Sequence, residues 1–337
     1  MTDLEKEDIK KIAESDYNWN ELKKKCIMVS GGTGFIGSLL LDVFRYRNLK
    51  YGDNIRVVSL SRRGGKSDNT VKYIKADITK ADITKAIDSI PQIDFIIHLA
   101  SNTHPKQYAE DPIGTITTNI FGCDNLLKLA VERKSRFLLA SSVEIYGQGS
   151  ETPMSEQYCG YIDCNQARAG YNEAKRTCES LCQSYRQQYG TDIVIARLAR
   201  TFGADKKKDT KAMAQFMEKA VEGKDIILKS NGSQRYSYCY VADAVSAIIK
   251  ILLDGIDGEV YNIADDDEKK TLGEYAEFIA KLAGRKVIYQ LENNSSVSKS
   301  TYALLDTKKI KMLGWMPMFS VSKGLEKTYK IYKQYLD

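Results

Sequence analysis

Residues 26–44 read CIMVSGGTGFIGSLLLDVF: a short apolar run, a glycine-rich turn and a longer apolar stretch. Three glycines recur at every third position of the turn. Because glycine has no side chain, backbone N–H groups at such a turn approach a pyrophosphate closely, and the amino end of the following helix adds positive charge. The stretch therefore predicts a dinucleotide-binding turn rather than a plain strand-to-helix connection. Its predicted cofactor contacts are Gly31, Thr33, Gly34, Phe35, Ile36 and Gly37.

Downstream of the turn, nearly all-apolar runs alternate with longer segments of helical spacing as far as residue 203. Such runs are typical of strands buried on both faces. The alternation predicts an α/β fold, a Rossmann-type doubly wound parallel sheet with a smaller C-terminal substrate-binding lobe. Strands are expected at 25–30, 55–60, 93–100, 137–141 and 193–198, and helices at 35–47, 115–133 and 171–189.

The chain divides, in this interpretation, into three parts. Residues 1–24 form a charged helical extension, 25–203 the dinucleotide-binding domain, and 204–337 mainly the substrate-binding lobe, interleaved with the first domain. Within the lobe, 212–221 and 241–253 are expected to be helical, and 226–228 and 260–263 extended.

Composition narrows the function classes. The 337 residues are 43% hydrophobic and 28% charged, which is typical of a globular protein. The net charge of +6 is spread along the chain, and clusters such as 206–208 are interpreted as solvated surface, so nucleic-acid binding is not expected. No apolar run is long enough to span a membrane and the N-terminus lacks an apolar leader core, so a cytoplasmic protein without membrane insertion is expected.

Cysteine and histidine usage argues against a metal site. Seven cysteines include no Cys-x-x-Cys pair, and both Cys159/Cys164 and Cys178/Cys182 are interpreted as buried thiols of a reducing compartment. His98 and His104 are the sole histidines, which disfavours a histidine-rich metal centre and a Ser-His-Asp hydrolase. No metal is expected.

The Gly-x-x-Gly-x-x-Gly spacing resembles that of the extended short-chain dehydrogenase/reductase family, which implies a tightly bound NAD or NADP. Members that select NAD usually carry an acid at the end of the second strand, whereas arginine favours the 2′-phosphate of NADP. This chain has Ser61, Arg62 and Arg63 there, which favours NADP. The resemblance further implies cofactor contacts at Asp77, Ile78, Leu99, Ala100 and Ser101.

The family's Tyr-x-x-x-Lys signature occurs three times, as Tyr46/Lys50, Tyr171/Lys175 and Tyr329/Lys333. Tyrosine has a pKa near 10 and serves as a base near neutrality only when a cation stabilises its phenolate. Lysine four residues later lies on the same helix face and supplies that charge. Only the second pair stands on a strongly amphipathic segment, so Tyr171 is the predicted base and Lys175 its partner, both also contacting the cofactor.

The segment SSVEIYG, residues 141–147, supplies two further predicted catalytic groups. Ser142 aligns with the family's serine or threonine that orients the sugar hydroxyl being oxidised. Glu144 aligns with the glutamate of the family's dehydratases and decarboxylases, and Tyr146 is then a structural residue. Val143 stands where dTDP-glucose 4,6-dehydratases typically carry an aspartate, which favours decarboxylation.

Other segments extend the resemblance along nearly the whole chain. RAGYNEAKR is similar to the corresponding helix start of UDP-glucuronate decarboxylases, and GSQRYSYCYVADAV and LGWMPMFSVSKGLEKT resemble family signatures. Arg200 replaces the family's asparagine, and Arg235 stands one position early. Both are predicted to bind the substrate diphosphate, besides Ser142 at the sugar.

The resemblance implies an enzyme that oxidises C4 of a nucleotide-linked sugar and then decarboxylates or 4,6-dehydrates the 4-keto intermediate. The alternatives are a 4-epimerase, a 4-ketoreductase, or a catalytically silent NADP-binding regulator. The family usually dimerises through two helices per subunit, here expected at 115–133 and 171–189.

Overall fold

Seven parallel strands form the central sheet in the computed structural model, which describes residues 1–80, 83–90, 92–101, 110–205, 210–266, 270–291 and 301–336. Their order is β11-β6-β5-β4-β1-β2-β3, so the order reverses between β1 and β4. His104 and the lysine cluster 206–208 lie outside the described residues. The strands are β1 Cys26–Ser30, β2 Arg56–Ser61, β3 Val71–Lys75, β4 Phe95–His98, β5 Arg136–Ser142, β6 Ile193–Leu198 and β11 Val260–Ile263.

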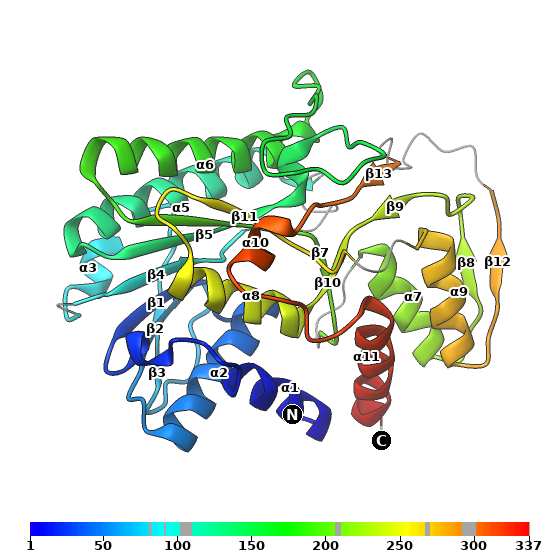
Figure 1. The fold of residues 1–337 in the computed structure, drawn as a ribbon, viewed down its shortest axis with the longest axis horizontal. Coiled ribbons are helices and arrows are strands. Elements are labelled where there is room, and N and C mark those ends of the chain that lie inside the picture. Colours follow the sequence, from blue (N-terminus) through cyan, green and yellow to red (C-terminus); the bar gives the residue numbers. More distant parts are fainter. Residues whose placement is uncertain are drawn as a thin grey trace.

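Helices cover both faces of the sheet (Figure 1). One face carries α5 and α6, which pack along each other, and the opposite face carries α2 and α8 with α1 outside them. These helices are α1 Asp3–Ala13, α2 Phe35–Tyr51, α5 Pro112–Arg133, α6 Ala169–Tyr189 and α8 Val241–Asp254; the short α3 is Ile83–Ile87. The Rossmann-type doubly wound sheet expected from the sequence is therefore confirmed.

A second group of elements lies beside the carboxyl ends of the strands (Figure 1). It contains three small parallel pairs, β10 with β7, β12 with β8 and β13 with β9. These strands are β7 Arg200–Phe202, β8 Ile226–Leu228, β9 Arg235–Tyr236, β10 Tyr238–Tyr240, β12 Val287–Tyr289 and β13 Tyr302–Ala303. The helices of this part are α7 Ala212–Val221, α9 Leu272–Leu282, α10 Lys308–Met312 and α11 Val321–Leu336.

The strands form where the sequence is apolar and β-branched, and their side chains are almost fully buried. All five residues of β1 and the last three of β11 are buried, because helices cover both faces. The core divides accordingly into one cluster on each side of the sheet. Cys123, Cys178 and Cys182 belong to the cluster beneath α5 and α6.

The N-terminal residues are part of the larger core cluster. Helix α1 begins with a capping box, in which the Thr2 side chain accepts a hydrogen bond from the backbone N–H of Glu5. Ile9 and Ile12 of this helix are buried in the core together with Trp19 of the 3-10 helix η1 (Trp19–Leu22). Buried Asp8 joins α1 to α11 by an ion pair with Lys327 at 2.7 Å. The two ends of the chain consequently lie near each other (Figure 1).

Candidate active site

A cavity of about 1280 Å³ runs along the carboxyl ends of the strands, between the sheet and the small strand pairs. Ligands of open α/β sheets bind at this edge, at the point where the strand order reverses. The predicted site residues that line it are Gly31, Thr33, Gly34, Phe35, Ile36, Gly37, Ser61, Arg62, Asp77, Ile78, Leu99, Ala100, Ser101, Ser142, Glu144, Tyr171, Lys175 and Arg200.

Arg235 is the predicted site residue that the structure does not bring to the cavity. It lies on β9 with an exposed side chain and is not among the described residues that line the cavity. The neighbouring Tyr236 takes that position, because successive side chains of a strand point to opposite faces. The structure therefore gives no support to Arg235 as a diphosphate ligand.

The glycine-rich turn has no room for side chains. Gly31 has a φ of +79°, and a Cβ there would lie 2.8 Å from the backbone nitrogen of Ala100. A Cβ on Gly37 would lie 2.3 Å from the carbonyl oxygen of Gly31. Gly34 is the N-cap of α2, so the first N–H groups of that helix have no partner within the helix and lie beside the cavity. This backbone cradle at a helix amino end fits the pyrophosphate of a dinucleotide.

The far end of the cavity follows β2 and β3. Ser61, Arg62 and Arg63 line it, and both arginines are exposed. Thr79 donates hydrogen bonds to Asp77 from its backbone nitrogen at 3.0 Å and from its hydroxyl at 2.8 Å. The backbone N–H of Thr79 is the largest influence that lowers the pKa of Asp77, and the charge of Arg62 adds to it. Asp77 is therefore a fixed, ionised acceptor at this end.

On α6, Lys175 and Tyr171 lie one turn apart and both line the cavity. Lys175 is only 2% exposed, and its Nζ donates to the carbonyl oxygen of Ala140 on β5 at 2.9 Å. In the Tyr46/Lys50 pair, Tyr46 donates to Glu14 at the surface. In the Tyr329/Lys333 pair, Lys333 donates to the carbonyl oxygen of Val221. Neither of those two pairs contributes a described residue to the cavity.

Ser142 and Glu144 stand where β5 passes into the short 3-10 helix η2 (Val143–Tyr146). The Ser142 hydroxyl caps this helix by accepting from the Glu144 backbone nitrogen at 3.2 Å. The Glu144 carboxylate accepts from Arg200 Nη2 at 3.3 Å and from Asn172 Nδ2 at 3.4 Å. The hydroxyl and the carboxylate are thus held beside each other at the cavity wall.

Asn172 and Tyr236 were not predicted from the sequence. Asn172 also donates to the Glu144 carbonyl at 2.7 Å, and the Arg200 guanidinium lies 3.9 Å from the centroid of the Tyr236 ring. Asn172 follows Tyr171 directly, but nothing in the spacing of α6 distinguishes it from other polar residues of the helix. Only their tertiary contacts identify Asn172 and Tyr236 as residues of the site.

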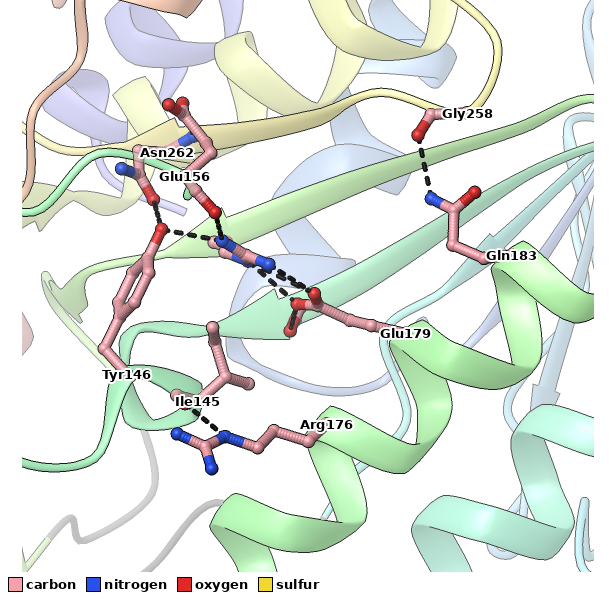
Figure 2. Close-up of polar contacts among 10 residues, drawn as sticks. Ile145, Tyr146, Glu156, Arg176, Glu179, Gln183, Gly258 and Asn262 are labelled. Carbon is pink, nitrogen blue, oxygen red and sulfur yellow. Dashed lines mark hydrogen bonds and ion pairs between the residues drawn. The ribbon is translucent and has the colours of Figure 1, made fainter. Parts of the chain in front are cut away.

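Behind the site, a buried polar network joins α6, β6, η2 and β11 (Figure 2). Arg197 binds both oxygens of Glu179, with the shortest contact at 2.6 Å, and donates to Tyr146 Oη at 2.9 Å. Tyr146 in turn donates to Asn262 at 2.6 Å. Burial raises the pKa of Tyr146 to about 12, so this tyrosine is a neutral structural group.

His98 ends β4 beneath the turn and is fully buried. Its Nδ1 lies 2.7 Å from the Ser30 hydroxyl, and burial together with the charge of Lys175 lowers the pKa of the imidazole to about 3. The ring is therefore neutral at ordinary pH and does not act as the base of this site.

All seven cysteines lie in the described part of the chain and are free thiols. Five are buried, which confirms the expectation for Cys178 and Cys182. Cys159 and Cys164 were expected to be buried and are exposed, because they stand in the long connection between η2 and α6, where no apolar periodicity directs a side chain inward. Along the described ranges, no helix combines the length and apolarity needed to cross a membrane.

Comparison with known proteins agrees with this geometry. The model of the family described as "NAD dependent epimerase/dehydratase family" matches residues 27–264. UDP-glucuronic acid decarboxylase 1 of Danio rerio is 31% identical over 323 residues, covering 94% of this chain and 75% of that protein. UDP-glucuronic acid decarboxylase 5 of Arabidopsis thaliana is 32% identical over 303 residues, covering 89% and 86%.

Solved structures share the fold at lower identity. UDP-glucose 4-epimerase from Thermotoga maritima with UDP-glucose has a TM-score of 0.80 at 24% identity, covering 93% of this chain and 100% of that one. The dTDP-glucose 4,6-dehydratase from Bacillus anthracis in complex with NAD has a TM-score of 0.77 at 22% identity, covering 92% and 97%. The family model spans more than half of the chain and the relatives above 30% identity cover most of it, so this chain belongs to the NAD-dependent epimerase/dehydratase family.

Proposed function

We propose that this protein decarboxylates a nucleotide-linked uronic acid, with UDP-glucuronate as the first candidate, through a 4-keto intermediate. The observation that carries the proposal is the cavity in which the glycine-rich cradle meets Ser142, Glu144, Tyr171 and Lys175. The names of the relatives, UDP-glucuronic acid decarboxylases, support the same reaction.

Each group has a distinct part in the proposed reaction. A bound nicotinamide supplies the acceptor and donor of the hydride at C4. Tyr171 takes the proton of the C4 hydroxyl, Lys175 stabilises its phenolate, and Ser142 holds the hydroxyl in place. The C4 ketone is β to the carboxylate on C5, so CO2 leaves while its bonding electrons pass to the C4 oxygen as an enolate. Glu144 delivers the proton that C5 receives after the CO2 has left.

Decarboxylation is favoured over 4,6-dehydration by the residue between Ser142 and Glu144. Loss of water from C5 and C6 needs a proton for the departing C6 hydroxyl, whereas loss of CO2 does not. Val143, which lines the cavity there, is apolar and buried and has no proton to give. A carboxylate beside the sugar is still required in both reactions, and Glu144 provides it.

For the cofactor, we propose NADP or NAD with a preference for NADP. NAD use is supported by the family description and by the NAD-bound dehydratase of the same fold. The preference rests on Arg62 and Arg63, which line the adenosine end and are exposed, so that either guanidinium can reach a 2′-phosphate. Gly31, Gly37 and the amino end of α2 would hold the pyrophosphate.

Location and assembly are also proposed. Seven free thiols support a reducing, cytoplasmic location. A homodimer through α5 and α6 is supported by two large apolar side chains on α5 that face solvent, Ile113 at 75% exposure and Phe121 at 53%. The division at residue 203 into a cofactor domain and a substrate lobe is likewise a proposal, with β11 and α8 as the interleaved elements.

Mass spectrometry of products from a nucleotide-sugar panel tests the proposal. The panel is UDP-glucuronate, UDP-glucose, dTDP-glucose, CDP-glucose and GDP-mannose, each with no added cofactor, with NAD and with NADPH. Loss of CO2 from UDP-glucuronate is the expected result. Loss of water indicates a dehydratase, an isomer of unchanged mass a 4-epimerase, and a gain of two hydrogens a 4-ketoreductase. Cofactor binding without turnover of any sugar indicates the regulator.

A further inference from the structure

Two arginine–carboxylate pairs lie close together in this protein and differ in how completely they are satisfied. Arg197 donates three hydrogen bonds of 2.6 to 3.2 Å to the Glu179 carboxylate, and both side chains are nearly buried, at 10% and 12% exposure. Arg200, three residues later, reaches Glu144 through one contact of 3.3 Å, at 26% and 36% exposure. The first pair is fully hydrogen-bonded, to each other and to neighbours such as Tyr146, whereas the second pair keeps hydrogen-bonding capacity that no described residue uses.

The unused capacity belongs to Arg200. A guanidinium has five N–H donors, and Nη1 of Arg200 is buried with no hydrogen-bond partner among the described residues. An unsatisfied buried donor is unfavourable unless a ligand or water completes it. The Tyr236 ring, 3.9 Å from the guanidinium carbon, holds the planar group at the cavity wall. Arg200 therefore lines the cavity with donors that its single contact to Glu144 does not use.

The position of Arg200 identifies the part of the substrate that it would meet. Glu144, its partner, is tied by its backbone nitrogen to the Ser142 hydroxyl at 3.2 Å, and Ser142 is the residue proposed to hold the C4 hydroxyl. In a hexuronate, the C6 carboxylate is attached to C5, next to C4, whereas the diphosphate is attached to C1 across the ring. Because Glu144 is proposed to act at C5, its partner Arg200 would stand on the C5–C6 side of the sugar rather than at the diphosphate.

Charge balance points to the same assignment. A substrate carboxylate that approaches Glu144 brings two negative charges together, and such an approach is unfavourable without a shared cation. Arg200 lies on the cavity wall with a fork of donors that can serve two carboxylates at once. We infer that Arg200 is the specificity-determining residue that binds the C6 carboxylate of a uronic acid substrate while remaining paired with Glu144. The inference rests on the proposed function for the identity of the substrate and replaces the diphosphate role expected for Arg200.

Binding of matched ligands to the cofactor-loaded protein tests this inference. UDP-glucuronate and UDP-glucose differ only at C6, and UDP alone reports the nucleotide. Calorimetric Kd values would be compared for wild type, Arg200→Gln and Arg200→Lys, with thermal unfolding to confirm that each variant is folded. Loss of a charge-assisted hydrogen bond predicts a roughly 10- to 100-fold weaker Kd of Arg200→Gln for UDP-glucuronate. UDP-glucose and UDP should change less than about threefold, and Arg200→Lys should recover part of the loss because it keeps the charge.

Three results would overturn the inference: an equal loss for all three ligands, which assigns Arg200 to the diphosphate; no loss for any ligand; or a wild type that does not prefer UDP-glucuronate to UDP-glucose. These outcomes are separate from the fate of the proposed function. An Arg200-dependent preference for UDP-glucuronate without release of CO2 would refute decarboxylation and leave the carboxylate site standing.

Discussion

The ε-amine of Lys175 donates a 2.9 Å hydrogen bond to the carbonyl oxygen of Ala140, joining α6 to the end of β5. The amine is buried, so its position is set by the sheet rather than by solvent. Tyr171 lies one turn earlier on the same helix and Ser142 two residues after Ala140 on the same strand. One strand end and one helix turn thereby bring the three proposed catalytic groups together.

Replacing Tyr171 by phenylalanine should abolish turnover and leave the cofactor bound. General base catalysis contributes about 100- to 10,000-fold, so turnover should fall by at least about 100-fold. The cofactor Kd should change little, because the cradle after β1 is untouched. The matched control is Tyr46→Phe, which removes a hydroxyl from the Tyr46/Lys50 pair at the surface. Equal turnover in Tyr171→Phe and the control would refute the assignment of the base.

Glu144→Gln should separate the two halves of the reaction. The amide keeps the size of the side chain and can still accept from Arg200, but it cannot take or give a proton at C5. Reduced cofactor and an intermediate that has not gained its C5 proton should accumulate at the expense of the finished pentose product, as followed by absorbance and mass spectrometry. Glu151→Gln, an exposed acid of the following loop, serves as control. A product spectrum identical to that of the wild type would exclude Glu144 from the C5 step.

Arg62→Ala should weaken NADP binding more than NAD binding. Hydrogen bonds to charged groups contribute about 1.5–3 kcal/mol, so the Kd of NADP should rise roughly tenfold or more. NAD lacks the 2′-phosphate and should be nearly unaffected. Arg56→Ala, at the opposite end of β2 and also exposed, controls for the general loss of a positive charge. If NADP and NAD weaken equally, Arg62 does not read the 2′-phosphate.

Gly37→Ala should reduce both stability and cofactor affinity. The new Cβ would lie 2.3 Å from the Gly31 carbonyl oxygen, a backbone atom that moves only if the turn opens. Overpacking of this kind typically costs about 1–3 kcal/mol, to be measured by urea denaturation alongside the cofactor Kd. Ser38→Ala, the exposed next residue of α2, should leave both quantities unchanged. A fully stable variant with normal affinity would contradict the tight packing of the turn.

Asp243 should give the protein a pH-dependent stability. Burial raises the pKa of this carboxyl to about 7, against the opposing hydrogen bonds from the backbone of Met318 and Phe319. Between pH about 4 and about 7 the folded state keeps a proton that the unfolded state has released. The free energy of unfolding should therefore fall as pH rises through this window, by at most about 4 kcal/mol at about 1.4 kcal/mol per pKa unit.

Urea denaturation at pH 5 and pH 8 measures this dependence. Asp243→Asn does not titrate, so its stability should decline less between the two pH values than that of the wild type. Asp88→Asn, at an exposed position, should reproduce the wild-type decline. Parallel behaviour of all three proteins would show that Asp243 does not hold its proton in the folded state.

The sequence by itself determined the features that depend on neighbouring residues. Apolar runs fixed the strands of the sheet, because both of their faces must be buried, and the glycine spacing fixed the cradle between β1 and α2. The position of Tyr171 and Lys175 after the segment SSVEIYG distinguished this pair. Helical period did not, because α11, which carries Tyr329 and Lys333, is also amphipathic. The ends of the elements differ from the expected ends by a few residues; β4, for example, is shorter than the apolar run 93–100 that predicted it.

The tertiary structure decided which distant side chains meet. Glu144 and Arg200 are 56 residues apart, and their pairing follows from the side-by-side position of β5 and β6 and from the start of β7 beside the cavity. Arg235, chosen from the sequence, remains outside because alternation along β9 turns Tyr236 inward instead. Periodicity records whether a side chain is buried, whereas contact between remote side chains depends on how the elements pack, and no local pattern encodes that arrangement.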